Sequence, residues 1–146
     1  MIRCRLDGRA AQLAAERRAD WADHTRPLRD RLEARLTGPP LEAEVLSCRT
    51  ERLANTSCFV LPGVPAETLL MNLDLEGIGA SSGSACATGS LEASPTLLAM
   101  GLTSERAGSS LRVSLGRETK EADVTAFARC LEGIVERLRE GRSAAG

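Results

Sequence analysis

The sequence of 146 residues contains few of the side chains that build metal and disulfide sites. Its single histidine is His24, and its five cysteines show no C-x-x-C spacing. One histidine and widely spaced cysteines argue against a zinc site, and an odd number of cysteines argues against a disulfide framework. We therefore predict no metal-binding residues in this chain.

No sign of charge dominates, and no apolar stretch approaches the roughly 20 residues that a membrane span needs. The formal net charge is −1 at pH 7, which gives no general attraction toward nucleic acid or anionic lipid. The N-terminus also lacks an apolar run behind a basic start, which is the pattern of a secretory signal. We therefore expect a soluble cytoplasmic protein that binds neither nucleic acid nor membranes directly.

Aromatic residues are scarce too, at 2 % of the chain, with no tyrosine among them. Hydrophobic residues still make up 42 % of the sequence, which is enough for one modest core in a chain of this length. We therefore expect one core rather than several, and that core must be mainly aliphatic.

The first quarter of the chain has the pattern of a long helix. The segment 6–36 is rich in Ala, Arg, Glu and Leu, and a leucine recurs every four residues from Leu28 to Leu36. Pro27 cannot donate an intrahelical hydrogen bond, so we expect it to start or kink a second part of this helix. The sequence Thr-Gly-Pro-Pro at 37–40 should end it.

Shorter elements follow this helix. Segments with Val, Thr, Phe and Leu between turn residues predict strands at 41–46, 56–61, 78–80 and 110–115. Proline or a capping residue before an apolar stripe predicts helices that begin near Pro65, Ser94 and Thr119. The stripe of the last helix contains Val124, Phe127, Leu131, Ile134 and Leu138. The order of these elements predicts an α+β fold, with a small, largely antiparallel sheet, helices packed on one face and a long N-terminal helix before it.

The segment 81–92 consists mostly of small residues around one cysteine, Cys86. Glycine and other small residues let a backbone move and approach a ligand closely, so a thiol there could travel to a reacting atom. The thiolate form would need stabilisation, and both the helix that begins near Ser94 and the guanidinium of Arg112 are candidates for it. Cys86 is therefore our candidate nucleophile, and the alternative is an inert cysteine in a flexible linker.

Arg112 lies among apolar residues of the strand predicted at 110–115, where a guanidinium could clamp a substrate carboxylate with two hydrogen bonds. An arginine on the exposed face of the sheet is the equally weighted alternative. We expect Cys58 and Cys130 to be buried fillers of the core. We expect His24 to be a solvated surface residue.

Several ordered motifs resemble the C-terminal small domain of cysteine desulfurases, which belong to the class V aminotransferase group. The matching stretches are RLANT at 52–56, LPGV at 61–64, LLMNLDLEGI at 69–78, SSGSAC at 81–86, SLE at 90–92 and LRVSLGR at 111–117. SSGSAC resembles the members with a long mobile cysteine loop, which serve iron–sulfur cluster assembly and tRNA thiolation. The resemblance implies a helical lead-in at 1–38 that joins the large and small domains, the small domain at 39–140 and a tail at 141–146.

The resemblance also implies a reaction. In the complete enzyme, pyridoxal phosphate binds L-cysteine, a loop cysteine attacks the sulfur of this substrate, and L-alanine leaves while a persulfide stays on the enzyme. Matched by motif, Cys86 would accept the sulfur and Arg112 would hold the substrate carboxylate. A sulfur-acceptor or scaffold protein would then take the sulfur.

The large domain that binds the cofactor in this family has no counterpart in the sequence. Lys120 is the single lysine beside eighteen arginines, and it lies far along the chain from any phosphate-binding segment. We therefore expect no covalent binding of pyridoxal phosphate by this chain and no activity of the chain alone. A cofactor-free persulfide carrier and an interaction module are the alternatives. Uncovered apolar faces would favour self-association or a bound partner, such as a separate large domain.

Overall fold

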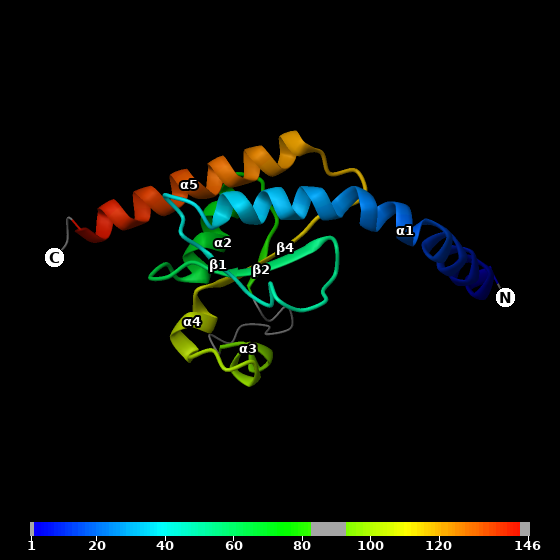
Figure 1. The fold of residues 1–146 in the computed structure, drawn as a ribbon, viewed down its shortest axis with the longest axis horizontal. Helices are drawn as coiled ribbons and strands as arrows, with labels where there is room; N and C mark the ends of the chain where they lie inside the picture. Colours follow the sequence, from blue (N-terminus) through cyan, green and yellow to red (C-terminus); the bar gives the residue numbers. More distant parts are fainter. Residues whose placement is uncertain (1, 83–92, 144–146) are drawn as a thin grey trace.

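The computed structural model describes residues 2–82 and 93–143 (Figure 1). The helices of this part are α1 (Ile2–Leu36), α2 (Ala66–Leu75), α3 (Pro95–Ala99), α4 (Ser104–Gly108) and α5 (Glu121–Ser143). The strands are β1 (Glu44–Val45), β2 (Thr56–Val60), β3 (Ser81–Ser82) and β4 (Ser110–Ser114).

The four strands form one antiparallel sheet with the order β1-β2-β4-β3. Its centre is the pair β2 and β4, in which Thr56 lies opposite Ser114 and Val60 opposite Ser110. The strands β1 and β3 add two residues each at the edges. The structure therefore confirms the predicted α+β fold with a small antiparallel sheet.

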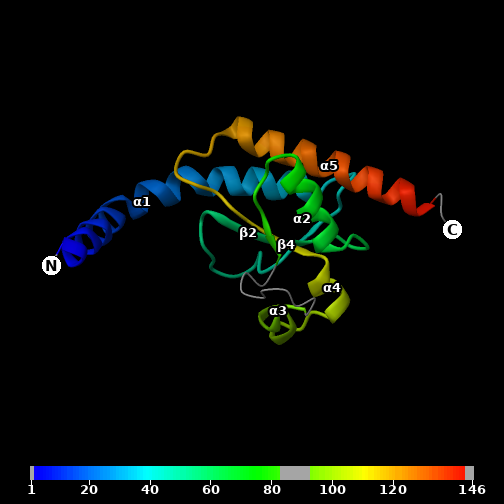
Figure 2. The ribbon, with the colours of Figure 1, turned by 180° about the vertical axis from the view of Figure 1, so that it is seen from behind.

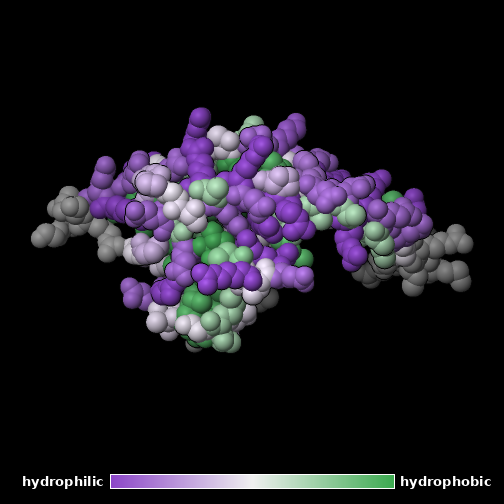
Figure 3. Space-filling view, viewed as in Figure 1, coloured by the Kyte–Doolittle hydropathy of each residue, from purple (hydrophilic) through white to green (hydrophobic). Residues whose placement is uncertain are grey.

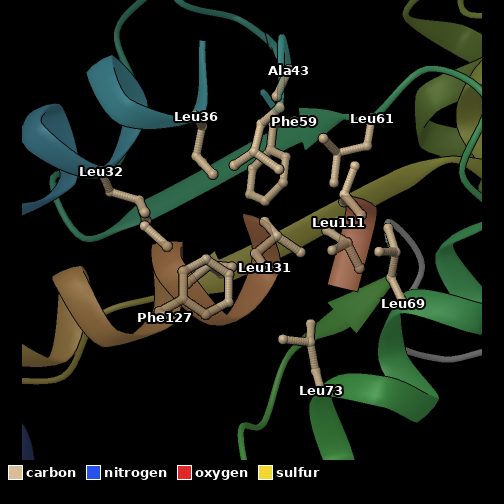
Figure 4. Packing of buried hydrophobic residues seen from close by; sticks show 14 of the residues in the cluster. Leu32, Leu36, Ala43, Phe59, Leu61, Leu69, Leu73, Leu111, Phe127 and Leu131 are labelled. Carbon is tan, nitrogen blue, oxygen red and sulfur yellow. The ribbon is translucent and has the colours of Figure 1, made fainter. Parts of the chain in front are cut away.

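The main hydrophobic core lies between one face of this sheet and the helices α1, α2 and α5, which the two opposite views show on the same side (Figures 1 and 2). The helices contribute leucines of the predicted stripes, such as Leu32 of α1 and Leu131 of α5. Phe59 and Leu111 meet them from the two central strands (Figure 4). The core is mainly aliphatic, as the composition predicts, and Phe59 and Phe127 are its aromatic members among the described residues.

The other face of the sheet carries a smaller cluster beneath α3 and α4 (Figure 1). Val60 of β2 packs there with Leu97 of α3 and Ala107 of α4. Hydrophobic side chains gather at the surface of this lower part, whereas α1 and α5 present mainly polar residues (Figure 3). The prediction of helices on one face of the sheet is thus incomplete, because the two short helices α3 and α4 cover part of the opposite face.

The structure corrects the expectation that Pro27 starts a second part of the first helix, because α1 continues through this residue to Leu36. Proline removes the hydrogen bond to the carbonyl of Asp23, but Asp23 is exposed, so water can bond to that carbonyl. The buried Leu28 and Leu32 hold the following turns against the core. The Thr-Gly-Pro-Pro segment ends the helix as predicted.

Other boundaries also differ from the sequence-based expectations. The edge strand lies at Ser81–Ser82 rather than 78–80, and the strand expected at 41–46 is reduced to Glu44–Val45. The helix α4 was not predicted. Thr119 lies two residues before the start of α5 at Glu121, and its Oγ1 accepts a hydrogen bond from the backbone N–H of Gly116 at 2.9 Å.

The N-terminal half of α1 extends beyond the body of the molecule (Figures 1 and 2). From Gly8 to His24 its side chains are exposed, apart from the half-buried Leu13 and Ala22. Among the described residues, no helix is both long and apolar enough to cross a membrane. At the other end of the chain, α5 continues to Ser143 and so enters the segment predicted as a tail.

Two leucines test this packing by the same chemical change. Leu131 of α5 is fully buried, whereas Leu75 of α2 is 86 % exposed. Leu131→Ala should lower the free energy of unfolding by about 3 kcal/mol, because it leaves a cavity in the core. Leu75→Ala should change it by less than about 0.5 kcal/mol. Urea unfolding followed by circular dichroism measures both, and equal losses would contradict the packing described here.

Candidate functional site

Arg112 occupies the middle of β4, where it pairs with Cys58 of β2 on one side and Ser81 of β3 on the other. Its neighbours Leu111 and Val113 point into the main core. Because side chains alternate along a strand, Arg112 lies on the opposite face of the sheet, and its side chain is half-buried there. The strand and the face predicted for Arg112 are therefore confirmed.

Arg112 differs from the other arginines that are shielded from solvent. Among the described residues it forms no hydrogen bond or ion pair, although it is half-buried. Each of the other buried or half-buried arginines of the described chain has an acceptor. These are Arg29 with Asp30 and the Leu53 carbonyl, Arg35 with Glu132, Arg52 with Glu33, and Arg139 with the carbonyls of Pro40 and Leu41. A guanidinium has five N–H donors, and one whose donors meet no acceptor in the described chain is suited to bind an anionic ligand.

Cys86, the candidate nucleophile, lies outside the described residues, and so does most of the segment around it. The structure describes the residues on both sides. Ser82 of β3 is the last described residue before the segment, four positions ahead of Cys86, and Ser94 and Pro95 begin α3 after it. The pairing of Ser81 with Arg112 therefore brings the start of this segment next to the candidate carboxylate-binding residue.

The prediction that Cys58 and Cys130 are buried fillers is only partly right, because both side chains are half-buried. Burial raises the pKa of the Cys58 thiol, and the nearby Arg112 offsets part of this rise. Burial also raises the pKa of Cys130, and the Glu76 carboxylate adds to the effect. Both groups are therefore neutral thiols at neutral pH. Cys48 is exposed.

The RLANT motif at 52–56 is bound to α1 by hydrogen bonds that were not predicted from the sequence. Arg29 is buried and donates from Nη1 to the carbonyl oxygen of Leu53 at 2.7 Å. Arg52 donates two hydrogen bonds to Glu33, at 2.6 and 2.7 Å, which raises the pKa of Arg52. Arg29 and Glu33 are four residues apart on a helix, so they share one face, but nothing in the sequence identifies their partners.

His24 is exposed, as expected, but its ring contacts another part of the chain. Its Nε2 lies 2.9 Å from the carbonyl oxygen of Thr119, just before α5. A carbonyl oxygen accepts hydrogen bonds, so Nε2 is the protonated nitrogen in this contact. His24 therefore joins α1 to the beginning of α5.

The protein-family model described as aminotransferase class-V matches residues 8–127 of the chain. The chain belongs to the class V aminotransferase family. Cysteine desulfurase 2 of Trichormus variabilis is 42 % identical over 132 residues, which cover 90 % of this chain and 33 % of that protein. Cysteine desulfurase IscS of Clostridium botulinum is 39 % identical over 137 residues, which cover 91 % of this chain and 34 % of that protein.

A solved structure gives the same result. The NifS-like protein of Rickettsia africae aligns with a TM-score of 0.77 and 29 % sequence identity, over 88 % of this chain and 33 % of that one. The chain thus spans about a third of the length of its relatives. Within the family it is a cysteine desulfurase-like domain.

Family enzymes depend on pyridoxal phosphate, but the surroundings of Lys120 do not fit the phosphate group of this cofactor. Lys120, the single lysine, is exposed just before α5, and its backbone N–H donates to Asp123. A cavity of about 340 Å³ lies beside this turn and has mainly apolar walls from α1, β4 and α5. The one charged residue in its lining is Asp123, which would repel a phosphate group. No cluster of three potential metal ligands occurs in the described part of the chain either.

Paired and unpaired arginines should respond differently to loss of charge. Arg52→Gln leaves the largely buried Glu33 without its partner, so it should lower the free energy of unfolding by about 2 kcal/mol. Arg112→Gln removes no hydrogen bond or ion pair among the described residues, so its effect should stay below about 0.5 kcal/mol. Thermal unfolding by calorimetry compares the two. A loss for Arg112→Gln as large as that for Arg52→Gln would reveal a structural partner for Arg112.

Proposed function

We propose that this chain is the small domain of a cysteine desulfurase, in which Cys86 accepts sulfur from L-cysteine and Arg112 binds the carboxylate of this substrate. The relatives that carry the name cysteine desulfurase support the reaction. The observation that supports the site most directly is the guanidinium of Arg112, which has no partner among the described residues and lies beside Ser81, at the start of the segment that contains Cys86.

In this reaction the thiolate of Cys86 attacks the sulfur atom of L-cysteine. A new S–S bond forms as the bond between sulfur and the β-carbon of the substrate breaks, and the β-carbon gains a proton to give L-alanine. Pyridoxal phosphate, when bound to the complete enzyme, labilises this carbon–sulfur bond. The contribution of Arg112 is to fix the substrate by its carboxylate, so that its sulfur lies within reach of the thiolate.

The rest of the machinery would come from outside this chain. Lys120 and its surroundings do not fit the cofactor, so a large domain, on the same or a separate polypeptide, would supply pyridoxal phosphate. We propose that α1, whose N-terminal half extends beyond the body of the molecule, leads toward this domain. The assembled enzyme would be a cytoplasmic homo-oligomer that passes sulfur to an acceptor or scaffold protein for iron–sulfur cluster assembly or tRNA thiolation.

A second function, that of a cofactor-free persulfide carrier, is favoured by the same misfit of the cofactor. In that case another desulfurase would load Cys86, and this chain would carry the sulfur to its acceptor. Arg112 would then serve as an anchor for an anionic group of the donor or acceptor protein rather than for free L-cysteine.

Mass spectrometry of the intact chain tests the proposed role of Cys86. After incubation with L-cysteine and the cofactor-containing large domain, the chain should gain the mass of one sulfur atom. Cys86→Ser should abolish this gain, whereas Cys48→Ser, which removes an exposed cysteine, serves as the matched control and should retain it.

Arg112→Gln should slow this gain about a hundredfold or more, because a bidentate charge-assisted contact to the carboxylate is lost. Loading of sulfur in the Cys86→Ser variant would contradict the proposal. Loading that requires a complete second desulfurase would identify the chain as a carrier.

A further inference from the structure

Cys58 is the direct neighbour of Arg112 on the sheet face that carries the proposed carboxylate site. The N–H of Leu61 bonds to the carbonyl of Ser109, and the N–H of Leu115 bonds to the carbonyl of Asn55. These bonds fix the alternation of the β2–β4 ladder, so the intervening pair of Cys58 and Arg112 is one without backbone hydrogen bonds between its members. Side chains approach most closely in such pairs, with Cβ atoms roughly 5 Å apart.

Packing holds the Cys58 side chain in this place. Cys58 contacts the small cluster beneath α3 and α4, which contains Leu46 and Val60. The N–H of Leu46, which directly follows β1, donates to the carbonyl of Cys58 at 2.8 Å, so Leu46 lies beside Cys58. A row of Leu46, Cys58, Arg112 and Ser81 therefore crosses the sheet, and Arg112 is its charged member.

A carboxylate on this face, that of Glu44, already has an ion-pair partner. Glu44 of β1 lies opposite Val60, which shares a face with Cys58. Arg106 of α4 forms an ion pair with Glu44. This pairing directs the Glu44 carboxylate toward α4, and Arg112 is left without an acidic partner in the described chain.

We propose that Cys58 is a positioning residue of the Arg112 site, which keeps the guanidinium available to carboxylate ligands because its side chain is small, packed and uncharged. This inference rests on the proposed role of Arg112. It assigns to Cys58 no sulfur transfer and no bond to the substrate. A negative charge at position 58 should therefore pair with Arg112 and weaken the binding of carboxylate ligands, whereas a neutral group of the same shape should not affect their binding.

Cys58→Asp and Cys58→Asn form a matched pair for the test, because the two side chains differ in charge and hardly in shape. The full chain is labelled with ¹⁵N, and the Nε–Hε signal of Arg112 is assigned by its absence in Arg112→Lys. L-alanine serves as the probe, since it has the carboxylate without a reactive thiol, and L-alaninamide is the control without a carboxylate.

Two results are expected. Without ligand, the Arg112 signal should shift in Cys58→Asp relative to Cys58→Asn, because the guanidinium pairs with the new carboxylate. The dissociation constant of L-alanine should be about tenfold higher in Cys58→Asp than in Cys58→Asn, as expected for competition by a close charged pair. An Arg112 signal that is the same in both variants, or equal dissociation constants, would overturn the inference.

The proposed function fails in a different way. If the wild-type chain binds L-alanine no better than L-alaninamide, or if Arg112→Gln leaves L-alanine binding intact, Arg112 does not bind carboxylates. The chemical shift of the Arg112 Nε–Hε signal, measured without ligand, still shows whether a charge at position 58 pairs with Arg112. Should Cys58→Asp fail to fold, a chain that keeps Cys58 and has serine at the other four cysteines provides a second pair. Iodoacetate then adds a charged group to Cys58 and iodoacetamide a neutral one, with the same two outcomes expected.

Discussion

The antiparallel pairing of β2 with β4 is the interaction on which the rest of the structure depends. Side chains alternate along both strands. Phe59 and Leu111 therefore lie in the main core, and Cys58 and Arg112 lie on the opposite face of the sheet. A slip of one residue would bring the charged Arg112 into an aliphatic core and expose Leu111. The hydrophobic core therefore fixes the position of Arg112 from the other face of the sheet.

Much of this arrangement follows from patterns in the sequence. The alternation at 110–115 predicts both the strand and the face of Arg112, and apolar stripes predict the packed faces of α1 and α5. The limits are physical. The strand β3 consists of Ser81 and Ser82, which carry no apolar alternation, so its place is set by pairing with β4 rather than by local propensity. The five residues of α4 are too few to give a helical pattern.

The electrostatic character of Arg112 could not be predicted from the sequence. The eighteen arginines look alike in the sequence, and among the described arginines that are shielded from solvent, the lack of an acceptor distinguishes Arg112. Arg52 bonds to Glu33, which is nineteen residues away in the sequence, and Arg29 bonds to the carbonyl of Leu53, which is twenty-four residues away. Such partners follow from the tertiary contact between α1 and the segment before β2. That Arg112 has no such partner in the part of the chain that the structure describes is likewise a property of the fold.

The measurement that tests the account most directly is a comparison of arginine reactivity in the folded chain. Phenylglyoxal modifies guanidinium groups that are not engaged in ion pairs, and peptide mass spectrometry gives the extent at each position. We expect Arg112 to react faster than Arg52 and Arg29, and we expect L-alanine to slow the reaction at Arg112 but not at exposed arginines. If Arg112 is as protected as Arg52 without any ligand, the guanidinium is not free and the account is contradicted.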